Sequence, residues 1–169
     1  FSGAIAKIEG YVNDGSIVEV YSHKNEFLAI GHYHKGSIAV KIFSFDKVIP
    51  DAEFWFNKLQ NAFLIRQKLG FAQKEKASAY RLVHGEGDGL PGLIIDVYHK
   101  TVVIQAHTIG MYMCKELITE ALQRIYGTQI DTIYDKSKNS LPKDYAETIE
   151  NSNLWGNTNQ SECVIDENT

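Results

Sequence analysis

Apolar residues alternate with polar residues in three early segments of the chain, which is the spacing typical of β-strands. The segments cover residues 17–22, 27–34 and 37–45, and short turns rich in Gly, Asn and Asp precede or separate them. A meander this short cannot bury a core by itself. We therefore expect it to close on itself or on the next element, forming a small β domain over residues 1–50.

The apolar spacing changes to that of a helix after Pro50. Asp51 is a suitable N-cap and Gly70 a suitable stop. Aromatic residues on an apolar helical stripe usually belong to the core, so Trp55 is predicted to be buried rather than to stack on a nucleotide base. Residues 51–78 are predicted to form this helix and a polar linker. The stripe consists of Ala52, Trp55, Phe56, Leu59, Ala62 and Phe63.

Residues 79–169 show a second pattern that mixes strands with a helix. Two strand-like runs flank a glycine-rich loop, and an amphipathic helix follows a third strand. The chain is thus predicted to be α+β, with a small mixed sheet and one packed helix in its second part. The expected elements are two strands within 80–98, a strand at 101–107, a helix at 111–125 that stops at Gly127, a strand at 130–134, a polar loop at 136–160 and a short strand at 163–165.

The glycine-rich loop, His-Gly-Glu-Gly-Asp-Gly-Leu-Pro-Gly from His84 to Gly92, permits three interpretations. A nucleotide or S-adenosylmethionine loop would need a helix N-terminus directly after the glycines, but Pro91 and strand-like spacing follow. A zinc deaminase also has a His-x-Glu motif, but its Pro-Cys-x-x-Cys partner is missing. We favour a structural hairpin whose glycines permit positive φ and close backbone approach. These are Gly85, Gly87, Gly89 and Gly92.

A hairpin closed by His84 and Leu93 predicts which residues face each other. Arg81 falls opposite Asp96 as a cross-strand ion pair, since directly opposed residues share a face. Leu82 falls opposite Ile95 on the core side, and Val83 falls opposite Ile94. In this interpretation Glu86 and Asp88 are turn residues that accept hydrogen bonds from nearby amides.

The run from Arg81 to Asp96, Arg-Leu-Val-His-Gly-Glu-Gly-Asp-Gly-Leu-Pro-Gly-Leu-Ile-Ile-Asp, closely resembles a signature of bacterial large-subunit rRNA methyltransferases. It matches the central domain of that family, whose members methylate carbon 5 of cytosine with S-adenosylmethionine. The opening Phe-Ser-Gly-Ala-Ile resembles the family's N-terminal RNA-binding PUA domain. The order and spacing of the two motifs match as well, so the resemblance covers most of the chain.

The resemblance implies a fold and a role for each part. Residues 1–50 would form a PUA-like β pseudo-barrel that is truncated at its N-terminus. Residues 79–169 would form the central domain, preceding a Rossmann methyltransferase domain that this chain does not include. The implied partner is ribosomal RNA in the cytoplasm, and S-adenosylmethionine would be a cofactor of the whole parent enzyme.

The catalytic residues of the family are not found in this sequence. The three prolines, Pro50, Pro91 and Pro142, are isolated, so no Asp-Pro-Pro motif exists. Cys114 lies on the apolar stripe of a predicted helix, and Cys163 lies beside Glu162, an unfavourable neighbour for a reactive thiolate. We therefore assign no catalytic residue and no cofactor to this chain, and expect it to be inactive alone.

Charge is distributed unevenly between the two parts. Nine Lys and Arg face seven Asp and Glu up to Lys74, a net charge of +2, whereas eight face fourteen from Glu75 onward, a net charge of −6. A polyanionic partner should prefer the first part. His32 and His34 lie two residues apart on one strand, but no third ligand has metal spacing, so we expect no metal site. The candidate RNA contacts are Lys7, Lys24, His32, His34, Lys35, Lys41 and Lys47.

Two function classes remain open. The first is the RNA-positioning portion of an rRNA methyltransferase. The second is a self-contained RNA-binding or protein-interaction module without enzymatic activity. No run reaches the roughly 20 apolar residues of a membrane span, and two distant cysteines give no disulfide framework. Neither class therefore includes a membrane partner.

Overall fold

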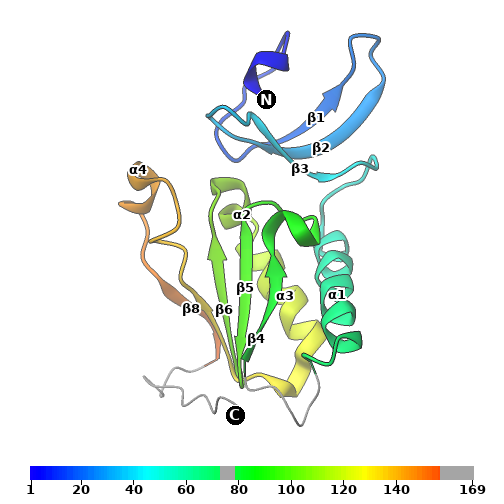
Figure 1. Cartoon of the computed structure of the whole chain (residues 1–169). Helices are drawn as coiled ribbons and strands as arrows, with labels where there is room; N and C mark the ends of the chain where they lie inside the picture. Colours follow the sequence, from blue (N-terminus) through cyan, green and yellow to red (C-terminus); the bar gives the residue numbers. More distant parts are fainter. Residues whose placement is uncertain (73–78, 157–169) are drawn as a thin grey trace.

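The computed structural model describes residues 1–72 and 79–156. It contains two sheets, a smaller one formed by the first part of the chain and a larger one formed by the second (Figure 1). The helices α1 and α3 pack against each other beside the larger sheet. The α+β fold predicted from the sequence is thus confirmed.

The smaller sheet has three antiparallel strands in the order β1-β2-β3. They are β1 (Ile17–Tyr21), β2 (Phe27–Tyr33) and β3 (Val40–Ser44). All three were predicted, with ends that extend one to three residues further than the observed ones. A short 3₁₀ turn, η1 (Ser2–Ala4), opens the chain, and the Ser2 amide donates to the Ser37 carbonyl at 2.8 Å. This bond holds the N-terminal segment against the β2–β3 turn.

The helix α1 (Ala52–Lys68) begins where its cap predicts. The Asp51 carboxylate accepts a hydrogen bond from the Phe54 amide at 3.0 Å, which satisfies one of the free amides of the first turn. Trp55, Leu59 and Ala62 are buried, so the predicted stripe faces the core. The indole of Trp55 donates to the Pro50 carbonyl, and base stacking by this residue is excluded by its burial.

The larger sheet has the order β4-β5-β6-β7-β8, with only β6 and β7 parallel. The parallel pair requires a crossover, which α2 and α3 supply. The strands are β4 (Ala79–His84), β5 (Leu93–Tyr98), β6 (Thr101–Ala106), β7 (Thr132–Asp135) and β8 (Ser152–Gly156). The other elements are η2 (Gly85–Asp88), α2 (Ile109–Met113), α3 (Lys115–Tyr126), η3 (Gly127–Gln129) and α4 (Lys143–Ala146).

Two predictions for this part were wrong. The helix expected at 111–125 is two helices that meet at Cys114, because α2 turns to pack on β2 while α3 follows the larger sheet. The polar loop expected at 136–160 contains α4 and the edge strand β8, which needs few apolar residues because it pairs on one side only. The strand predicted at 163–165 lies outside the described residues.

The two sheets share one apolar core. Ile30 and Phe43 of the smaller sheet belong to the same cluster of buried residues as Trp55 and the larger sheet. The seam between them depends on glycine, because a Cβ on Gly110 would lie 2.3 Å from Cγ of His32. Gly15, with φ +90°, allows a similar approach to Ile109. The smaller sheet therefore packs closely against α2.

Candidate functional site

The glycine-rich loop joins β4 to β5, and β5 begins directly after it at Leu93. The loop contains only the single 3₁₀ turn η2, so no helix N-terminus faces a ligand there. Gly85, Gly89 and Gly92 have positive φ, and a Cβ on Gly92 would lie 2.5 Å from Cγ2 of Thr108. The loop is a structural hairpin, as favoured from the sequence.

The predicted ion pair across the hairpin is present. Arg81 lies opposite Asp96 and binds it through two hydrogen bonds, Nε to Oδ1 at 2.8 Å and Nη2 to Oδ2 at 3.0 Å. These bonds raise the pKa of Arg81.

The register between Arg81 and the loop differs from the prediction. Val83 pairs with Ile95 and His84 with Ile94. A β-bulge at Leu82 adds one residue to β4, which leaves both Leu82 and Val83 fully buried. The pairings predicted for these two residues were wrong for that reason.

A second ion pair, which the sequence did not reveal, ties α1 to the hairpin. Arg66 binds Asp88 through two hydrogen bonds of 2.5 and 2.7 Å, and both side chains are largely buried. The same carboxylate accepts from the His84 amide at 2.6 Å, so Asp88 is also the turn residue that was predicted. The Arg66 Nε atom donates to the Arg81 carbonyl, and the Arg81 Nη1 atom lies 3.3 Å from His84 Nδ1.

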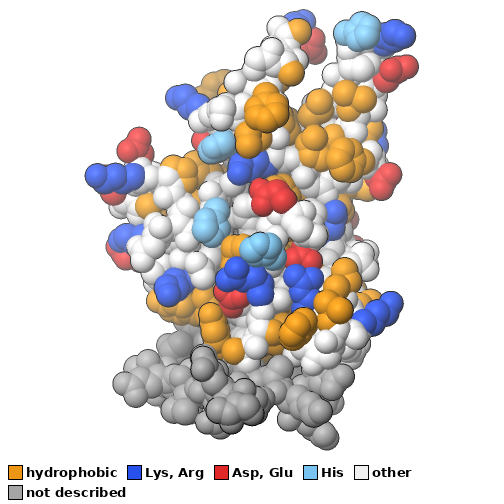
Figure 2. Space-filling view, viewed as in Figure 1, with side chains coloured by type: hydrophobic (Ala, Val, Ile, Leu, Met, Phe, Trp, Pro, Cys, Tyr) orange, Lys and Arg blue, Asp and Glu red, His pale blue; other side chains and the backbone are white. Residues whose placement is uncertain are grey.

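We call Arg66, Arg81, His84, Asp88 and Asp96 the hairpin cluster. Figure 2 shows cationic, acidic and imidazole side chains gathered over this region of the molecule. Each arginine is neutralised by a bidentate carboxylate. The cluster therefore holds the hairpin in place and offers little net charge to an anionic ligand.

Among the candidate RNA contacts, four lysines are exposed on the smaller sheet and its N-terminal segment: Lys7, Lys24, Lys35 and Lys47. Lys41 and His34 are half-buried, and His34 Nδ1 lies 3.3 Å from Asp14 Oδ1. Two of these lysines form ion pairs, Lys7 with Glu9 at 2.7 Å and Lys47 with Glu19 at 3.2 Å. The candidates are thus spread over this part of the molecule rather than gathered in one cluster.

The prediction that His32 faces RNA is corrected by its burial. Only 2% of His32 is exposed, and its ring stacks on Trp55 with ring centroids 6.3 Å apart. His32 Nε2 lies 3.7 Å from Cys114 Sγ. Burial lowers the pKa of His32 to about 4 and raises the pKa of Cys114 to about 11, so both groups are neutral near pH 7. His32 is a core residue of the seam between the sheets.

Lys47 takes part in a small aromatic and basic group that sequence reasoning missed. Its Nζ atom donates to the Tyr21 hydroxyl at 3.0 Å and lies 5.7 and 5.8 Å from the ring centroids of Tyr21 and Phe27. The hydrogen bonds to Tyr21 and Glu19 raise the pKa of Lys47. A cation beside an exposed aromatic ring can contact both a phosphate and a base. Tyr21 and Lys47 are 26 positions apart, so no local sequence pattern indicates this group.

Comparison with known proteins confirms the resemblance. Residues 1–45 match a family of PUA-like domains. The chain is 35% identical over 99% of its length to ribosomal RNA large subunit methyltransferase I of Aliivibrio fischeri, of which it covers 42%. It is 36% identical over 85% of its length to the Escherichia coli protein of the same name, of which it covers 36%. The chain thus spans about two fifths of the curated relatives it matches.

Two solved structures have the same fold as this chain. A candidate SAM-dependent methyltransferase from Streptococcus mutans aligns with a TM-score of 0.72 and 22% identity, covering 92% of this chain and 39% of that one. A second structure, of a candidate methyltransferase complexed with SAH, aligns with a TM-score of 0.68 and 22% identity, covering 86% of this chain and 35% of that one. Within residues 1–72 and 79–156, no helix is long and apolar enough to cross a membrane.

Proposed function

We propose that this chain is the RNA-binding and RNA-positioning portion of an S-adenosylmethionine-dependent rRNA methyltransferase. The observation that carries the proposal is its 35% identity, over nearly its full length, to a ribosomal RNA large subunit methyltransferase. The PUA-like family match over residues 1–45 supports placing RNA contacts on the smaller sheet. The parent resembles enzymes that methylate carbon 5 of cytosine in 23S rRNA, which gives a cytoplasmic location.

In this proposal RNA binds the smaller sheet and is kept at a fixed orientation relative to the larger sheet. The exposed lysines of the smaller sheet contact phosphates, which position a nucleic acid without reading its sequence. The shared core and the close fit of Gly110 on His32 keep the two sheets together. Bound RNA would therefore keep one orientation relative to the larger sheet.

We also propose that this chain binds no S-adenosylmethionine and is inactive alone. The glycine-rich loop does not fit the cofactor, because no helix follows its glycines and two of its amides are used within the loop: Gly89 donates to the Glu86 carbonyl and Leu90 to the Gly85 carbonyl. Its acidic residue Asp88 is bound by Arg66. Calorimetric titration with S-adenosylmethionine should give no binding heat. A stoichiometric complex with micromolar affinity would overturn this part of the proposal.

The RNA role is tested with two charge-reversal variants of the whole chain, because the shared core makes separate halves unsuitable. Lys24→Glu with Lys47→Glu alters the smaller sheet, and Lys100→Glu with Lys143→Glu makes the same charge change beside the larger sheet. Binding to a structured rRNA fragment is measured over a range of salt concentrations. The first variant should weaken binding and lower the salt slope by about one per lost phosphate contact. A larger loss of RNA affinity in the second variant than in the first would contradict the proposal.

A further inference from the structure

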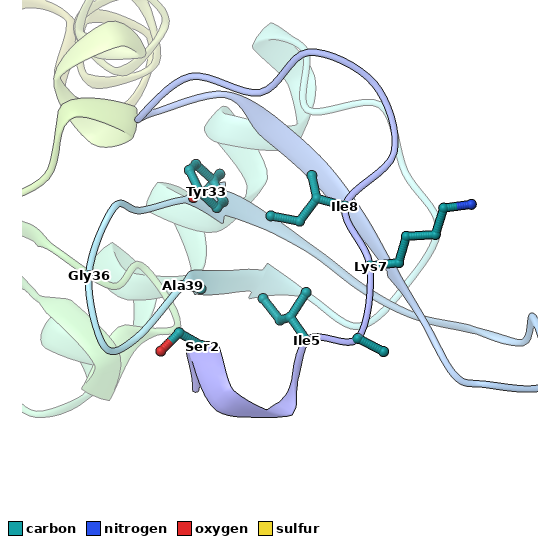
Figure 3. Close-up of a pocket in the computed structure, with 8 residues that line it drawn as sticks. Ser2, Ile5, Lys7, Ile8, Tyr33, Gly36 and Ala39 are labelled. Carbon is teal, nitrogen blue, oxygen red and sulfur yellow. The ribbon is translucent and has the colours of Figure 1, made fainter.

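A hollow of about 350 Å³ lies between the N-terminal segment and the smaller sheet (Figure 3). Ile5 and Ile8 enter it from the N-terminal segment, and Ala39 and Tyr33 face it from the sheet. Its walls are mostly apolar, and the Ser2 hydroxyl lies at one side. Of the candidate RNA contacts, only Lys7 lines this hollow.

The walls of the hollow are held by backbone hydrogen bonds. The Tyr33 amide donates to the Ser16 carbonyl and the Tyr33 carbonyl accepts from the Gly15 amide, both at 2.8 Å. The Ser2 amide binds the Ser37 carbonyl on the opposite side. The backbone on both sides of the hollow is thus ordered before any ligand arrives, which reduces the entropy lost on binding.

The chemistry of the hollow suits a flat, partly apolar group with polar edges. The half-buried Tyr33 ring offers a stacking surface, and Ile5 and Ile8 offer apolar contact. Among the residues the structure describes, the hydroxyls of Tyr33 and Ser2 have no hydrogen-bond partner, so each can bind a polar edge. An unpaired nucleobase has this combination of a π face and hydrogen-bonding edges.

Two lysines lie beside the hollow, Lys35 and Lys7, and the charge of Lys7 is balanced by Glu9 at 2.7 Å. The Lys7 side chain is 75% exposed and points away from the hollow rather than into it (Figure 3). The exposed Lys35 lies in the β2–β3 turn between the lining residues Tyr33 and Gly36. Lys35, and Lys7 when it exchanges Glu9 for a phosphate, can contact the phosphates that flank an inserted base.

We propose that this hollow receives one unpaired base of the bound RNA, with Tyr33 as the stacking surface and Ile8 as the opposing wall. This inference rests on the proposed RNA role and adds to it a preference for single-stranded over fully paired RNA. Base-paired RNA keeps its bases stacked inside the helix and cannot place one in the hollow.

The test uses the whole chain and two kinds of probe, single strands of oligo(A) or oligo(U) and the duplex they form together. Affinity is measured by fluorescence anisotropy, and the methyl signals of Ile5 and Ile8 are followed by NMR. Tyr33→Ala should lower the affinity for single strands about tenfold. Because Tyr33 is half-buried, Ile8→Glu is the second variant, since Ile8 is 50% exposed and its replacement leaves the core intact.

Ile65→Glu is the matched control, because Ile65 is 49% exposed and lies on α1, outside the hollow. We expect single strands to shift the Ile5 and Ile8 signals, Ile8→Glu to weaken binding by about tenfold, and Ile65→Glu to change it less than twofold. Single-strand binding that is unchanged in Tyr33→Ala and Ile8→Glu, with no shift of these signals, overturns the inference alone. Absence of any RNA binding overturns both the inference and the proposed function.

Discussion

Two buried residues of the hairpin cluster, Arg66 and Asp88, link α1 to the hairpin. The sequence predicted the other pair, Arg81 with Asp96, because a hairpin register can be counted from its loop. It could not predict the Arg66 pair, whose members are 22 positions apart and belong to elements with no local pattern in common. The same limit applies to His32, whose burial depends on the approach of Gly110 from a distant helix.

Asp88→Ala is expected to lower the free energy of unfolding by about 3 kcal/mol, because it leaves the guanidinium of Arg66 buried without its carboxylate. Asp88 and Arg66 side chains are only 6% and 15% exposed. Glu53→Ala is the control, since Glu53 pairs with Arg124 at the surface with 60% and 40% exposure, and it should cost less than about 1 kcal/mol. Urea denaturation gives both values. Equal costs would show that burial does not strengthen the Arg66 pair.

His32 should make stability depend on pH below neutrality. Its folded-state pKa of about 4 is below the ordinary value of 6.5, owing to burial. The unfolded chain therefore takes up the proton first, so stability present above pH 6.5 falls as pH decreases toward 4 and then levels off. The loss should total roughly 3 kcal/mol.

The pH effect is isolated by comparing the wild type with His32→Leu over pH 4 to 7. His23→Ala serves as the control, because His23 is exposed in the β1–β2 turn. We expect the stability of the leucine variant to lose the part that depends on the protonation of His32. The stability of the His23→Ala control should keep the same pH dependence as the wild type. A pH profile that is the same in all three proteins would show that His32 is not buried in solution.

At the scale of elements, apolar periodicity predicted the strands that have one buried face. It also located α1, since Asp51 supplies a local cap. It failed for β8, where only Leu154 and Trp155 are apolar, because the pairing with β7 rather than the side chains defines the strand. It also missed the break at Cys114, which is required by contacts between α2 and the smaller sheet.

The rates of backbone amide hydrogen exchange test whether β8 is a strand of the larger sheet. Amides of β5 and β6, which are paired on both sides, should exchange most slowly, and those of the edge strand β8 should exchange faster. Amides of β8 that pair with β7 should still be slower than those of residues 147–151, which lie outside helices and strands. Equal exchange in β8 and residues 147–151 would contradict the five-stranded sheet.

At the scale of the whole molecule, the seam between the sheets determines how RNA on one would be presented to the rest of an enzyme. The sequence predicted a division after residue 78, and composition alone could not reveal that His32, Trp55 and Gly110 join both sides. The hollow beside Tyr33 likewise arises only when the N-terminal segment folds back on β2 and β3. Both features depend on contacts between residues far apart in the sequence.

Ultraviolet cross-linking of the whole chain to total ribosomal RNA tests the central claim most directly. Mass spectrometry identifies the linked peptides, and sequencing identifies the linked RNA. We expect linked RNA to be enriched in large-subunit rRNA and linked peptides to fall mainly within residues 1–50. No enrichment over small-subunit rRNA, or linked peptides confined to residues 79–156, would contradict the proposal that this chain positions large-subunit rRNA through its smaller sheet.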